Sequence, residues 1–142
     1  MVTRLKAPVN EVFSYIADFR TLQDYNPSVL RVDPIGDSAP AVGGRFRITL
    51  RMFGRRIEPV LTITEMKQNE LIATRLDTFI SAVEKRSFAA SGNQTEFLFT
   101  IEFFSKWPLL GSLVDAILVR LFAKSQAQTE VGLLEKRFNE GN

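Results

Sequence analysis

The residues best suited to chemistry in this sequence are a carboxylate and a guanidinium, Glu84 and Arg86, two positions apart. If Phe88 points into the protein, alternation along an extended strand places both charged side chains on the same inner face. There they could orient the polar end of a ligand, or Glu84 could act as an acid or base. Burial raises the pKa of a carboxyl group, and a neighbouring arginine opposes that shift. The alternatives are an ion pair near a sheet edge, or a strand of opposite facing with Val83 inward.

The chain contains no histidine and no cysteine. This excludes Ser-His catalysis, thiolate nucleophiles, disulfides and cysteine metal sites. It also removes the commonest metal ligand and the usual general base at neutral pH. We therefore predict no catalytic residue, no metal site and no cofactor. Whether the protein is an enzyme is not decided by these absences, but they favour a protein without enzymatic activity.

The largest set of candidate ligand-binding residues is apolar. Its members alternate along predicted strands or recur at helical spacing, so each could belong to the core or to the wall of a cavity. A strongly curved sheet with one helix across it cannot fill all its concave volume, and twelve phenylalanines supply rigid walls without hydrogen-bonding demand. A cavity lined in this way stays dry and accepts an apolar ligand. The set comprises Phe46, Ile48, Leu61, Ile63, Phe88, Phe97, Phe99, Ile101, Leu113, Ile117 and Leu121.

Five arginines cluster around a predicted strand over 45–52, on the side facing water. Charges at alternate positions of an outward face usually form a solvated surface; the alternative is contact with the phosphate groups of a membrane or of nucleic acid. The aromatic residue of this strand points to the opposite face, so the arginines lack a stacking platform, and we predict no nucleic-acid partner. The five are Arg45, Arg47, Arg51, Arg55 and Arg56.

The start of the predicted C-terminal helix is apolar almost all the way round. One stripe covers the sheet, and the surplus either packs against the first helices or stays exposed. An exposed surplus could form a homodimer contact or a peripheral membrane contact, with Trp107 as an interfacial anchor. This surplus comprises Leu110, Val114, Leu118 and Phe122.

Residues 1–142 are expected to form one domain, because a chain of 142 residues has the usual size of a domain. A short strand is predicted over 2–6, followed by a helix with apolar residues at i, i+3, i+4 and i+7 from Val9. Thr21 is predicted to cap a short second helix. Residues 33–40 are predicted to form a surface loop.

Alternation with a period of two then replaces helical spacing. Inward-facing rows of apolar residues and turn residues predict strands over 45–52, 57–63, 71–77, 82–90 and 95–103, with a hairpin turn at 91–93. A long helix over 109–138 follows. It has no second long helix to pair with and must lie across the sheet, so the fold class is α+β.

This order of elements resembles the helix-grip fold of the START-like (SRPBCC) superfamily, which takes in Bet v 1-type allergens and polyketide cyclases. From Phe79 onward the chain resembles the polyketide cyclase/dehydrase and coenzyme Q-binding branch, in which an aromatic residue often stands where this chain has Arg86. The resemblance covers essentially the whole chain. The matching residues are Ala7-Pro8 before a helix with Val12-Phe13 inward, Leu22 and Tyr25 before Pro27, Val42-Gly43 before the long hairpin, and Gly92 and Thr95 before the last strand.

The resemblance implies an apolar cavity between the sheet and the C-terminal helix, with Tyr25 at its mouth. The Tyr25 hydroxyl could donate to a ligand carbonyl or simply pack. The leading hypothesis is a protein that binds or carries a hydrophobic small molecule such as a lipid, a quinone or a polyketide. The alternatives are a polyketide cyclase or dehydratase using Tyr25, Glu84 and Arg86, and a membrane-associated lipid-chaperone module. A cytoplasmic location is expected, because no signal peptide is visible.

Overall fold

The computed structural model describes residues 1–36, 40–78, 81–104 and 113–139, except for the side chains of 103, 104 and 113–119. Its elements in chain order are β1 (Val2–Leu5), α1 (Val9–Ala17), a 3₁₀ turn (Phe19–Thr21), α2 (Leu22–Tyr25), β2 (Val29–Ile35), β3 (Arg45–Met52), β4 (Arg55–Ile57), β5 (Val60–Lys67), β6 (Leu71–Asp77), β7 (Ser81–Ser91), β8 (Gln94–Phe104) and α3 (Leu113–Asn139).

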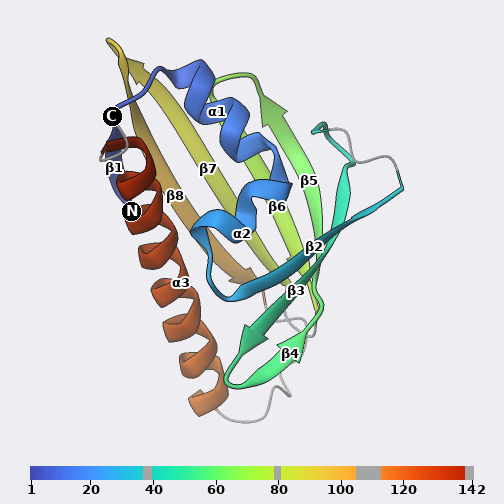
Figure 1. Cartoon of the computed structure of the whole chain (residues 1–142). Helices are drawn as coiled ribbons and strands as arrows, with labels where there is room; N and C mark the ends of the chain where they lie inside the picture. The colour runs from blue at the N-terminus through green and yellow to red at the C-terminus, as the bar shows by residue number, and fades with distance from the viewer. Residues whose placement is uncertain (37–39, 79–80, 105–112, 140–142) are drawn as a thin grey trace.

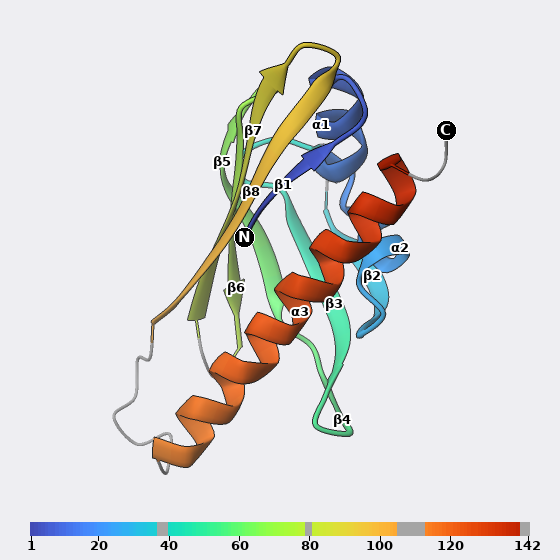
Figure 2. The ribbon, with the colours of Figure 1, turned by 90° about the vertical axis from the view of Figure 1, so that its left-hand side faces the viewer.

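The strands form one curved antiparallel sheet in the order β1-β8-β7-β6-β5-β3-β2, with β4 paired to β3. In Figure 1, α1 and α2 lie over one face of this sheet, and α3 runs beside β1 and β8. Turned by 90°, α3 is seen to run obliquely past the strands (Figure 2). The predicted α+β helix-grip architecture is confirmed.

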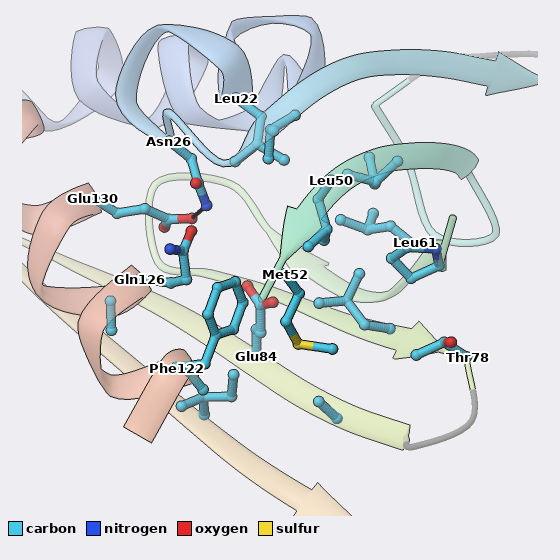
Figure 3. Close-up of a pocket in the computed structure, with 18 of the residues that line it drawn as sticks. Leu22, Asn26, Leu50, Met52, Leu61, Thr78, Glu84, Phe122, Gln126 and Glu130 are labelled. Atoms are coloured by element: carbon cyan, nitrogen blue, oxygen red, sulfur yellow. Dashed lines mark hydrogen bonds between the residues drawn. The ribbon is translucent and has the colours of Figure 1, made fainter. Parts of the chain in front are cut away.

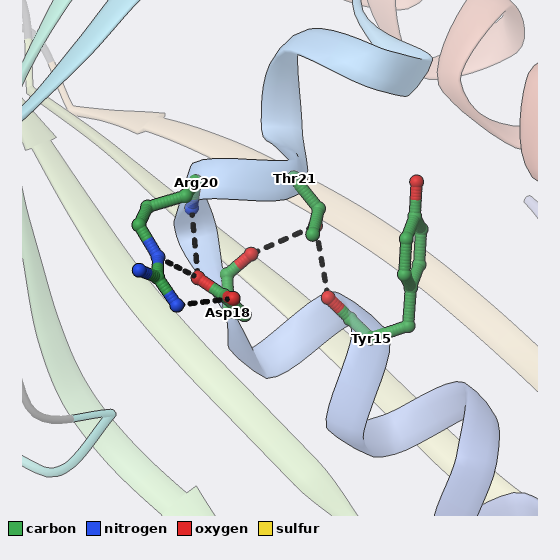
Figure 4. Close-up of polar contacts among 4 residues, drawn as sticks. All are labelled: Tyr15, Asp18, Arg20 and Thr21. Atoms are coloured by element: carbon green, nitrogen blue, oxygen red, sulfur yellow. Dashed lines mark hydrogen bonds and ion pairs between the residues drawn. The ribbon is translucent and has the colours of Figure 1, made fainter.

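The first helix forms where the sequence predicts it, because its apolar face is buried. Val12, Phe13 and Ile16 are each at most 2% exposed. Asp18 ends α1 and accepts hydrogen bonds from the Arg20 backbone and guanidinium (Figure 4). Thr21 does not cap α2 as predicted. Its hydroxyl instead lies 2.8 and 2.7 Å from the carbonyl oxygens of Tyr15 and Asp18, so it stabilises the end of the preceding helix.

Alternation along β3, β7 and β8 also matches the prediction. Phe46 and Ile48 of β3 are buried, and the intervening arginines are exposed. Phe88 on β7 contacts Phe97 on β8, with ring centroids 5.4 Å apart, and Phe13 of α1, at 5.2 Å. These three rings belong to the hydrophobic core, in which α1 packs against the sheet.

Two strand predictions need correction. Residues 33–35 are not loop, because β2 extends through Ile35 and pairs with β3. Pro34 has no N–H to donate, which an edge strand tolerates, and β2 is the last strand of the sheet. The inward row over 57–63 is split into β4 and β5, because Pro59 interrupts the ladder.

The C-terminal helix is held by the N-terminal strand. Thr3 donates to Glu135, and the Lys6 backbone N–H donates to Asn139. Val131 and Leu134 are at most 3% exposed and pack into the core. The predicted start of this helix at 109 lies outside the described residues. No helical stretch in the described part of the chain has both the length and the hydropathy needed to traverse a bilayer.

Candidate functional site

An apolar pocket of about 130 Å³ lies between the sheet, α2 and α3. Its walls come from strands β2 to β8 on one side and from α2 and α3 on the other. Figure 3 shows the polar side chains Asn26, Gln126, Glu130 and Glu84 together, and Leu61 and Thr78 away from them. The other principal wall residues are Leu22, Val29, Ile48, Leu50, Met52, Ile57, Pro59, Leu76, Ala82, Arg86, Phe99, Ile101, Phe122, Ala123 and Ala127.

All but one of the predicted ligand-binding residues fall into three groups. Ile48, Leu61, Glu84, Arg86, Phe99 and Ile101 line this pocket. A second group is buried in the core and is not among the pocket-lining residues: Tyr25, Phe46, Ile63, Phe88 and Phe97. The side chains of Leu113 and Ile117 lie outside the described residues.

One predicted residue is in the wrong place. Leu121 is 58% exposed and points away from the pocket. Steps of four residues drift around a helix that has 3.6 residues per turn, so an i, i+4 row starting at Leu113 leaves the inner face. Phe122 lines the pocket instead, whereas the sequence left its side chain either packed against the first helices or exposed. Its ring contacts Phe53 of the β3–β4 turn, with ring centroids 5.5 Å apart and the ring planes tilted by 54°.

The polar end of the pocket is a buried cluster of charges centred on Arg86. Its guanidinium Nη2 lies 3.0 Å from Glu84 Oε2 and donates to Glu130 Oε2 at 3.1 Å. The guanidinium also lies over the Phe99 ring, 4.6 Å from the centroid. The side chains of Arg86, Glu84 and Glu130 are 1%, 10% and 6% exposed. The predicted inward facing of Glu84 and Arg86 is confirmed, and β7 is an inner strand of the sheet rather than its edge.

Residues that directly follow α2 hold the Glu130 carboxylate in place by hydrogen bonds. Asn26 Nδ2 donates to Glu130 Oε1 at 2.9 Å, and Asn26 Oδ1 accepts from the Ser28 backbone N–H. The Ser28 hydroxyl accepts from Gln126 Nε2. The cluster therefore connects β7, α3 and the end of α2 through groups that are far apart in the sequence.

Burial changes the acid–base properties of this cluster. It raises the pKa of Glu84; nearby Arg86 opposes the shift and Glu130 adds to it. Burial alone lowers the pKa of Arg86, but Glu130 and Glu84 together raise it above its usual value, so the guanidinium stays charged. Burial also raises the pKa of Tyr25. The Tyr25 hydroxyl has no hydrogen-bond partner among the described residues.

The raised pKa of Glu84 predicts a specific pH dependence of stability. The folded protein binds the Glu84 proton more tightly than the unfolded chain, so this group's contribution falls as pH rises from about 4.5 through the raised pKa. Urea unfolding from pH 4 to 8 should show this fall in the wild type and not in Glu84→Gln. Glu102→Gln, an exposed acid on β8, serves as the control. Parallel stability curves for wild type and Glu84→Gln would contradict the assignment.

Sequence reasoning missed Asn26, Gln126 and Glu130. One signal for Glu130 was present in the sequence. Its position falls in the row of buried residues along α3 that also contains Ala127, Val131 and Leu134. An acid in such a row needs a buried partner. Within the described residues, no group of three or more acidic side chains is placed to hold a metal ion. The arrangement can orient a polar group and exchange a proton with it.

Solved structures share this fold at low sequence identity. The Zhui aromatase/cyclase from Streptomyces sp. R1128 superimposes with a TM-score of 0.81 at 14% identity, covering 96% of this chain and 92% of that one. A START superfamily protein from Mycobacterium smegmatis gives 0.77 at 17%, covering 100% and 97%. A protein from Thermus thermophilus gives 0.79 at 15%, with the same coverage of 100% and 97%. No curated protein matches the chain significantly.

The sequence of the chain also matches the model of a protein family. It is described as polyketide cyclase / dehydrase and lipid transport, and it covers residues 1–138. This range includes every strand of the sheet and every residue that lines the pocket. The chain therefore belongs to the polyketide cyclase / dehydrase and lipid transport family.

Proposed function

We propose that this protein binds or carries a small hydrophobic molecule in the pocket between the sheet and α3. The observation that carries the proposal is the pocket of about 130 Å³ that the packed core leaves unfilled, with apolar walls and one polar end. Burial of apolar surface contributes roughly 25 cal/mol per Å², so a ligand can be held with few polar contacts. Family membership supports a hydrophobic ligand without naming it.

The volume limits the part of the ligand that is enclosed. Apolar protein cavities of about 150 Å³ hold one benzene ring. A ring or a short alkyl segment fits the pocket as it stands. A longer lipid, quinone or polyketide extends past Phe122, which forms part of the wall and is only partly buried.

A pocket-filling substitution tests the proposal. Ala123 on α3 lines the pocket and is 7% exposed. Ala123→Phe places a ring where the ligand would lie and should weaken binding by at least about tenfold, while the fold stays intact. Native mass spectrometry of the purified wild type, followed by melting temperatures with naphthol, a short-chain quinone and decanol, measures binding.

Ala89→Phe is the matched control, because Ala89 lies exposed on the same sheet. It should leave the ligand response unchanged. Two results would refute the proposal: no co-purified molecule together with no melting shift across the panel, or equal ligand responses in Ala123→Phe and the wild type.

The buried charge cluster favours a second candidate, a cyclase or dehydratase. Glu84 lies in the pocket beside a fixed cation, and a carboxyl group with a raised pKa is suited to proton transfer near neutral pH. The Glu84→Gln protein separates the two candidates: a carrier still binds its uncharged hydrophobic ligand and has no turnover to lose, whereas an enzyme keeps binding but loses turnover.

A further inference from the structure

The guanidinium of Arg86 is short of acceptors. An arginine carries five N–H donors. Its Nη2 serves both Glu84 and Glu130, but Nε and Nη1 have no hydrogen-bond partner among the described residues. Arg86 is 1% exposed, so bulk water does not satisfy these donors. Leaving a buried donor unpaired is unfavourable, and more so for a charged group. Arg86 lines the pocket, and its buried donors Nε and Nη1 therefore have room for an oxygen acceptor that no described residue provides.

The charges of the cluster determine which oxygen fits. One guanidinium faces two carboxylates, so the cluster has a surplus of negative charge when both acids are ionised. A third carboxylate brought in by a ligand would meet Glu84 and Glu130 at close range in a region of low dielectric. The oxygen of an uncharged carbonyl accepts a hydrogen bond without adding charge.

The residues of the pocket wall indicate the chemical character of the rest of the ligand. Phe99 lies beneath the guanidinium, and Ile48, Leu61 and Ile101 continue the apolar lining beyond it. A carbonyl on a ring-sized or short apolar body can thus meet Arg86 while the body fills the remaining volume. We propose that Arg86 binds the carbonyl oxygen of an uncharged ligand and that the pocket discriminates against carboxylates of the same size. This inference rests on the proposed function and specifies its ligand class.

Three probes of one shape test it. Acetophenone carries a carbonyl, α-methylstyrene replaces the carbonyl oxygen with a methylene, and benzoate carries a charge. NMR titration of the wild type should show acetophenone binding at least about tenfold more tightly than either of the others. Equal binding of acetophenone and α-methylstyrene would leave an apolar pocket and overturn the carbonyl site. Benzoate binding as tightly as acetophenone would overturn the discrimination, and failure of all three would refute the pocket itself.

Two variants complete the test. Glu84→Gln removes one carboxylate and should narrow the preference for acetophenone over benzoate by about threefold or more. Arg86→Met alone leaves two carboxylates without a cation, so it is combined with Glu84→Gln and Glu130→Gln to keep the fold free of buried charge. This triple variant should bind acetophenone and α-methylstyrene equally. A preference for acetophenone that survives in the triple variant would show that Arg86 is not the donor.

Discussion

Replacing Arg86 with methionine should destabilise the protein by about 3–5 kcal/mol at neutral pH, which is the effect of removing one partner from a buried ion cluster. Methionine fills much of the same volume, so the loss is electrostatic. Glu84 and Glu130 would face each other without the cation that both now contact. Urea unfolding at pH 7 measures the change.

The pH dependence of this variant distinguishes lost charge pairing from lost packing. Without Arg86 nothing opposes the effect of burial on Glu84, so the pKa of Glu84 rises further and the stability of the variant rises as pH falls. The deficit relative to the wild type should therefore shrink towards pH 4. The triple variant with Glu84→Gln and Glu130→Gln should recover most of the loss at pH 7, because no buried charge remains.

Arg75→Met is the matched control. Arg75 pairs with Asp77 on the adjacent strand β6, but its side chain is 51% exposed. Exposed pairs contribute about 0–1 kcal/mol. Equal losses in Arg75→Met and Arg86→Met would mean that the cluster is not effectively buried.

Phe97→Ala should destabilise the protein by about 3–5 kcal/mol, the usual effect of removing a phenyl ring from a close-packed core. Phe97 is fully buried, and its ring packs on Phe88 at 5.4 Å. It belongs to the core rather than the pocket wall. Ligand binding measured at a temperature where the variant is folded should therefore be unchanged, even though stability falls steeply.

The neighbouring Leu98 provides the comparison, since it is 36% exposed on the opposite face of β8. Leu98→Ala should change stability by no more than about 0.5 kcal/mol. Loss of ligand binding in folded Phe97→Ala would show that the core and the pocket are not independent.

The parts of this structure that the sequence predicts are those set by local spacing. Alternation places Phe46 and Ile48 on the inner face of β3, and the position of Phe88 correctly places Glu84 and Arg86 inward. The sequence could not distinguish core residues from residues of the pocket wall. Phe97 and Phe99 are the same residue type and face the same side of β8. Only the folded structure shows that the Phe97 ring packs on Phe88 and that the Phe99 ring lies under Arg86.

The rest of the site depends on contacts that cross most of the chain. Glu130 is 44 positions from Arg86 and 104 positions from Asn26, and no local pattern links them. The error at Leu121 has a related cause, since the rotation of a long helix about its axis is set by what it packs against. Pairing of Pro34 in β2 also depends on the strand being at the sheet edge, which is a property of topology.

The closure of the chain on itself has a consequence for biosynthesis. β1 pairs with β8, and α3 is fastened to β1 by Thr3 and Lys6. The ribosome makes α3 after all the strands, so Glu130 reaches Arg86 only when that segment has emerged. Contacts between such distant segments also form slowly. A nascent chain must therefore keep Arg86 without its Glu130 partner, and keep the apolar pocket wall exposed to water, until translation of the helix is finished. This is the stage at which a molecular chaperone has most to protect.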